Sequence, residues 1–98
     1  MIQIPAIPVL EAIYFPPQTH QQLAKRCQDM MDDTWVECTA GLDQDVVIQQ
    51  MKKHKHWNEH QALTEQLYHL QRDGSLAQYQ WGLERLFKMF TRIVIDSL

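Results

Sequence analysis

Apolar residues recur every three or four positions along the last third of the chain. The positions in this series are Leu76, Tyr79, Leu83, Leu86, Phe90 and Ile93. At 100° per residue they share one side of a helix, and their alternating spacing is typical of a seam that packs against another helix. The pattern therefore predicts a long amphipathic helix over 76–96. Gly82 is its weak point, because an interior glycine costs about 1 kcal/mol relative to alanine.

Capping patterns predict where the other helices begin. Thr19 and Ser75 each stand three positions before a glutamine, which is the spacing of a capping box, and Asn58 repeats it. Asp43 is a further N-cap candidate. Together with the apolar spacing, these signals predict four helices, over 19–32, 43–55, 59–72 and 76–96. The short turn at Asp73 and Gly74 predicts that the last two form an antiparallel hairpin.

Two short segments have the composition of strands. The segments 9–15 and 34–39 are rich in β-branched and aromatic residues. All four prolines lie in the first 17 residues, so this region is not one continuous helix. We expect a mainly α fold with a small two-stranded element formed by 9–15 and 34–39. The alternative is an all-α fold, in which this segment is a short helix with Pro8 at its first position.

Composition indicates one small globular domain over 1–98. The chain has 98 residues, of which 45% are hydrophobic and 21% charged. Its N-terminus lacks the basic region of a signal peptide, and no apolar run reaches the length of a membrane span. We therefore expect a cytoplasmic protein without a membrane partner. Two cysteines, Cys27 and Cys38, do not form a disulfide framework, and we expect reduced thiols that serve packing.

No catalytic constellation stands out, so we expect a protein that is not an enzyme and needs no cofactor. The chain has no glycine-rich phosphate loop and no evident acid–base pair of carboxylates. His54, His56 and His60 are close in sequence, and 56–60 match the H-x-x-E-H pattern of inverted zincins. That motif needs one continuous helix, which a cap at Asn58 would interrupt. Metal binding by these histidines is therefore the weakest alternative.

A tryptophan and three basic residues occupy the side of the last predicted helix that is opposite its apolar seam. They are Trp81, Arg85, Lys88 and Arg92. Tryptophan and arginine are enriched among the residues that dominate binding energy in protein interfaces. The competing interpretation is that another part of the domain covers Trp81. This helix face is our first candidate for partner binding.

A run of acidic residues gives a second candidate surface. Between positions 29 and 45 the chain has six acidic residues and no lysine or arginine. Asp29, Asp32 and Asp33 are the candidates for contact with a basic partner. Acids at a helix C-terminus oppose the helix dipole, so Asp32 and Asp33 are unfavourably placed if the first helix ends at 32.

These observations favour a protein-interaction module, such as a small inhibitor, adaptor or accessory subunit, with a protein partner. The alternative is a small nucleic-acid-associated factor that uses the same basic face with Lys52, Lys53 and Lys55, although the formal net charge of −3 argues against it. The apolar residues Met89, Ile95 and Leu98, which lie outside the main seam of the last helix, leave a homodimer open.

Overall fold

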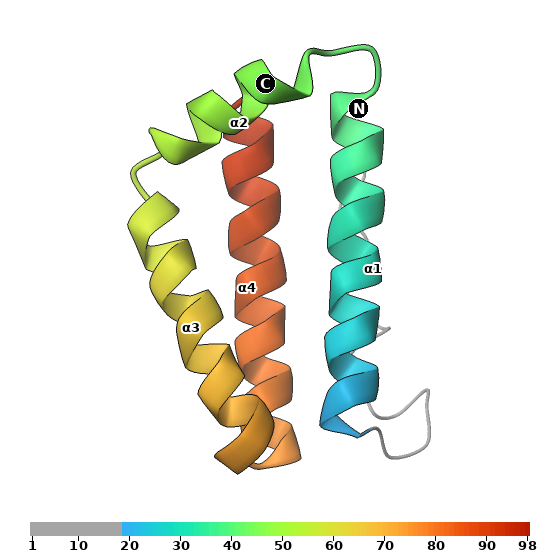
Figure 1. The fold of residues 1–98 in the computed structure, drawn as a ribbon, viewed down its shortest axis with the longest axis vertical. Helices are drawn as coiled ribbons and strands as arrows, with labels where there is room; N and C mark the ends of the chain where they lie inside the picture. The colour runs from blue at the N-terminus through green and yellow to red at the C-terminus, as the bar shows by residue number, and fades with distance from the viewer. Residues whose placement is uncertain (1–18) are drawn as a thin grey trace.

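The computed structural model describes residues 19–98, which form four helices and contain no strand (Figure 1). The helices are α1 (His20–Thr39), α2 (Gln44–Lys52), α3 (Trp57–Asp73) and α4 (Leu76–Asp96). α4 is the central helix: α1 and α3 pack on its two sides, and α2 crosses near its C-terminal end. α3 and α4 run antiparallel, which confirms the predicted hairpin. No described helix is long and apolar enough to cross a membrane.

The strand predicted over 34–39 is wrong, because this segment is the last part of α1. Thr34 and Cys38 are buried and continue the row that begins with Leu23 and Cys27. Steps of four and seven along this row place it on one side of a helix, which packs on α4. Tertiary packing thus overrides the β preference of the segment. The predicted strand over 9–15 lies outside the described residues.

Three of the four predicted helix starts are confirmed. Thr19 and Ser75 each form a complete capping box, and the Asp43 side chain accepts hydrogen bonds from the first turn of α2. The cap at Asn58 is wrong, since α3 already begins at Trp57 and its N-cap residue is His56. The end predicted for the second helix is also late, as α2 stops at Lys52.

The seam of α4 forms the centre of the core. Tyr79, Leu83, Leu86 and Ile93 are buried, while Leu76 and Phe90 are half-buried. One core cluster joins α1, α3 and the first half of α4 around Phe87, and a second joins α1, α2 and the end of α4 around Val94. These clusters fix the positions of the outer helices on α4.

Gly82 has a packing role that its low helix propensity does not reveal. A Cβ at this position would overlap a terminal carbon of the Leu67 side chain. The absence of a side chain therefore allows α3 to approach α4 closely, with Leu67 lying against the α4 backbone.

Candidate functional site

The predicted tryptophan and basic residues all lie exposed on α4. Trp81, Arg85, Lys88 and Arg92 form what we call the outer face of α4. Trp81 is 66% exposed, so the rest of the domain leaves most of its indole in solvent. The three basic side chains are also exposed. The helix thus presents one large aromatic group beside a row of positive charges.

Charge on the outer face is largely unneutralised within the described residues. Arg92 approaches the Asp96 carboxylate at 3.7 Å, whereas neither Arg85 nor Lys88 forms an ion pair in 19–98. Arg85 borders two grooves, of about 330 and 320 Å³. The first also includes Trp81 and the second includes Lys88. The surface beside Trp81 is therefore uneven and positively charged.

The acidic residues of α1 are partly satisfied by near neighbours. Asp29 forms an exposed ion pair with Lys25 at 3.2 Å, and Asp32 accepts a hydrogen bond from the Gln28 amide at 2.9 Å. Because α1 continues to Thr39, Asp32 and Asp33 lie inside the helix and not at its C-terminus. The expected conflict with the helix dipole is therefore absent.

His54 connects the turn between α2 and α3 to the end of α4. Its Nδ1 atom accepts a hydrogen bond from the backbone N–H of His56 at 3.0 Å. The ring hydrogen is then on Nε2, which lies 2.9 Å from an Asp96 carboxylate oxygen and donates to it. This hydrogen bond, together with the positive charge of Arg92, lowers the pKa of Asp96.

The three histidines do not form a shared ligand set. His56 faces Glu59 at 3.4 Å, whereas the His60 ring stacks on Trp57 with centroids 6.0 Å apart. In the part of the chain that the structure describes, no three histidine, cysteine or acidic side chains converge as metal ligands. The arrangement gives His54 and His56 contacts at the helix junction and places His60 among aromatic rings.

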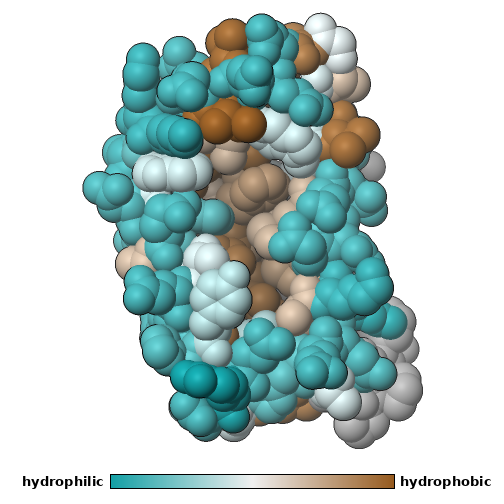
Figure 2. Space-filling model, in the orientation of Figure 1, coloured by the Kyte–Doolittle hydropathy of each residue, from teal (hydrophilic) through white to brown (hydrophobic). Residues whose placement is uncertain are grey.

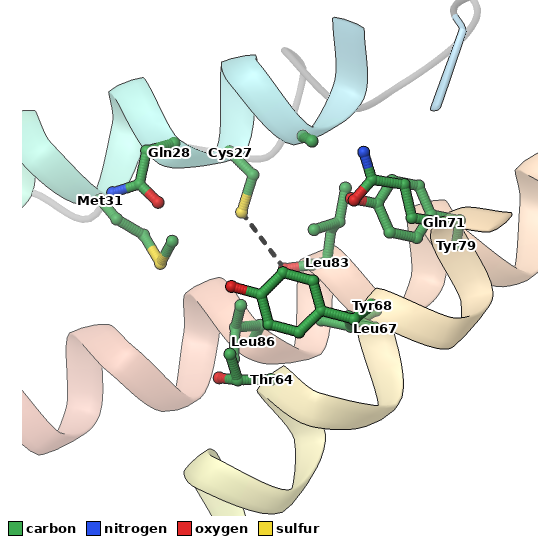
Figure 3. Close-up of a pocket in the computed structure, with 11 residues that line it drawn as sticks. Cys27, Gln28, Met31, Thr64, Leu67, Tyr68, Gln71, Tyr79, Leu83 and Leu86 are labelled. Atoms are coloured by element: carbon green, nitrogen blue, oxygen red, sulfur yellow. Dashed lines mark hydrogen bonds between the residues drawn. The ribbon is translucent and has the colours of Figure 1, made fainter. Parts of the chain in front are cut away.

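Both cysteines are buried and free. Burial raises the pKa of the Cys27 thiol to about 11. The Cys27 Sγ lies 3.8 Å from the backbone oxygen of Leu83, between α1 and α4 (Figure 3). Burial also raises the pKa of Cys38, with a contribution from the charge of Glu37. A thiol that resists ionisation is a poor nucleophile, which supports a packing role.

An apolar cleft between α1 and α3 is a further candidate site that the sequence did not reveal. Figure 2 shows it as a hollow lined by hydrophobic residues between the polar surfaces of the two outer helices. Its wider part, beside α2, has a volume of about 420 Å³. Its main apolar lining residues are Met31, Trp35, Ile48, Trp57, Leu86 and Phe90. We call this feature the α1/α3 cleft.

The cleft continues along α4 into a narrower part of about 140 Å³ (Figure 3). Gln28, Met31, Thr64 and Leu86 line both parts, so the two are continuous. Tyr68 of α3 borders the narrow part, and its side chain is largely exposed. The floor of the cleft is the same side of α4 that carries the seam.

One polar group in the wall of the cleft has no partner. The Nε2 atom of His60 is sealed from solvent and forms no hydrogen bond within the described residues. Burial lowers the pKa of His60, which favours the neutral ring. Buried polar atoms are nearly always hydrogen-bonded in folded proteins, so this atom is an exception that calls for an explanation.

Comparison of the chain with protein-family models, with curated proteins and with solved structures gives no match. The functional interpretation therefore depends on the two surfaces themselves.

Proposed function

We propose that this protein is a non-enzymatic protein-interaction module, such as a small inhibitor, adaptor or accessory subunit, that binds a partner through the outer face of α4. The observation that carries the proposal is the exposure of 66% of Trp81 next to Arg85 and Lys88. Burial of an exposed tryptophan by a partner lowers the free energy of the complex. Arginine beside it adds several hydrogen-bond donors in a fixed geometry.

The chemistry of this face indicates an acidic partner surface with an apolar pocket. Trp81 would fill the pocket, and carboxylates around it would pair with Arg85 and Lys88. Such charge pairs at the edge of an interface chiefly increase the rate of association and select the partner, while the buried aromatic group supplies most of the affinity.

A partner other than a second copy of this chain fits the outer face better. The homodimer alternative depends on apolar residues outside the seam, of which Met89 and Ile95 are half-buried within the domain. Leu98 is 51% exposed, so it alone of the three leaves much apolar surface for self-association. A cytoplasmic location is part of the proposal, because two buried reduced cysteines suit a reducing compartment.

The test is affinity capture from the native host, after nuclease treatment, with quantitative mass spectrometry of the bound proteins. We expect Trp81→Ala to reduce the captured partner by about ten-fold or more, because truncation of a central interface tryptophan commonly costs 2 kcal/mol or more. Val36→Ala is the matched control, since Val36 is an apolar residue that is 64% exposed on α1. It should leave capture unchanged.

Two results would contradict the proposal. One is a Trp81→Ala, Arg85→Ala double variant that folds normally and retains every association of the wild type. The other is binding to nucleic acid in place of protein, with an affinity that falls steeply as salt increases.

A further inference from the structure

We propose that the α1/α3 cleft binds a small, uncharged and mostly apolar molecule that carries a hydrogen-bond acceptor for His60. This site is separate from the outer face of α4. Leu86 and Phe90, which line the cleft, lie about half a turn around α4 from Lys88 and Arg92. The proposal therefore adds a ligand to the module and does not depend on its partner.

The size and lining of the cleft are those of a small-molecule site. Its wide part, of about 420 Å³, falls within the range of about 300–1,000 Å³ that ligand pockets usually have. Trp35, Trp57 and Phe90 reach it from three different helices. Aromatic and methionine side chains give large contact area, and methionine adapts to the shape of a ligand.

His60 defines the polar group that the ligand needs. The Gln61 side-chain nitrogen lies 3.4 Å from Nδ1 of His60, and an amide nitrogen can only donate. Nδ1 is then the acceptor, and the neutral ring carries its hydrogen on Nε2, the atom without a partner. As the structure stands this N–H is sealed from solvent, so a ligand can meet it only if the ring turns about its soft terminal torsion, which also releases Gln61. A carbonyl or ether oxygen would satisfy it.

Charges around the cleft favour an uncharged ligand. Asp32 lines the wide part, and no lysine or arginine of the described residues does. An anion would meet this carboxylate without a compensating positive charge, since burial keeps His60 neutral. A cation could pair with Asp32, but it would bring no acceptor for Nε2–H. A neutral acceptor satisfies Nε2–H without repulsion from Asp32.

The shape of the cleft favours a compact molecule over a partner helix. A helix with its side chains is about 10 Å wide and needs a groove of even width. Here the volume falls from about 420 to about 140 Å³ between the two parts, and Tyr68 borders the narrow one. The wide part alone matches a ligand of one or two rings.

Two probes of equal shape test the proposal. Acetophenone carries a carbonyl oxygen where α-methylstyrene carries a methylene group. Each is titrated into the full chain while NMR follows the indole N–H signals of the three tryptophans. We expect both to shift the signals of Trp35 and Trp57 and to leave Trp81 unchanged. His60→Phe should weaken acetophenone about ten-fold and α-methylstyrene less than two-fold, the difference being one neutral hydrogen bond.

Three further variants control for folding and for the location of the binding site. Ile48→Trp adds bulk at the wall of the wide part and should abolish binding of both probes. If Ile48→Trp does not fold, Thr64→Met, which also adds bulk to this wall and is checked for folding, takes its place. Trp81→Ala should bind both probes as the wild type does. The site is ruled out if neither probe shifts Trp35 or Trp57 up to its solubility limit. If His60→Phe lost affinity for both probes equally, the role of His60 as a hydrogen-bond donor would be overturned.

Discussion

The outer face of α4 and the α1/α3 cleft lie on opposite sides of the same helix, and they are built differently. The outer face consists of side chains that point into solvent from one regular helix, so α4 alone determines it. The cleft exists because α1 and α3 both pack on α4 and make few contacts with each other. Its walls come from four helices.

On the outer face of α4, a substitution can change binding without changing the stability of the fold. In the cleft, a substitution changes both. Residues of the outer face can change with little effect on folding, because they bury little surface within the domain. Residues of the cleft floor belong to the core cluster, so any change there alters both the core and the site. Three predictions test this contrast.

The largest effect is expected in the cleft floor. Leu86→Ala should lower the free energy of unfolding by roughly 2–4 kcal/mol, because Leu86 is 6% exposed and lines both parts of the cleft. Trp81→Ala, on the outer face, should change it by less than about 0.5 kcal/mol. Chemical denaturation of the two variants measures the contrast. Equal losses would show that Trp81 packs within the domain.

A smaller loss of stability is expected from a substitution where α3 approaches α4. Gly82→Ala gains about 1 kcal/mol of helix propensity, but the new methyl group must displace Leu67, which is buried. Such overpacking typically costs about 1–3 kcal/mol, so we expect a net loss of roughly 1 kcal/mol by denaturation. Ala62→Gly, at an exposed position in the interior of α3, shows the size of the propensity term alone. A stabilised Gly82→Ala variant would mean that the two helices are not in close contact.

The smallest effect is a dependence of stability on pH that originates in the cleft. Burial lowers the pKa of His60 below its ordinary value of 6.5. The unfolded chain then takes up a proton near pH 6.5, whereas the folded chain does so only at lower pH. Stability contributed by the neutral ring is complete above pH 6.5 and decreases as the pH falls below it. Denaturation between pH 8 and 5 should show a shallower decrease for His60→Phe than for the wild type. Parallel curves would contradict the burial of His60.

The sequence predicted most of the helices because their signals are local. The capping boxes at Thr19 and Ser75 and the spacing of the α4 seam lie within single segments. The segment 34–39 was misassigned because its β-type composition is local too, whereas its burial against α4 is not. Asn58 was misassigned for a similar reason, since the capping-box spacing also occurs by chance inside a helix.

The two candidate sites differ in the same way. The outer face could be recognised from the spacing of Trp81, Arg85, Lys88 and Arg92 in one helix. The cleft could not, since it depends on how far apart α1 and α3 settle on α4. A partial signal was present in Met31 and Trp35, which are four positions apart, but it becomes visible only when α1 is extended to Thr39.

The placement of the three tryptophans makes the protein its own spectroscopic reporter. Trp81 is in water, while Trp35 and Trp57 are half-buried in the cleft. Emission from Trp81 is therefore redder and more open to quenching by iodide than emission from the other two. A partner that covers the outer face and a molecule that fills the cleft would change different components of one fluorescence spectrum, so the occupancy of both surfaces can be followed without an added dye.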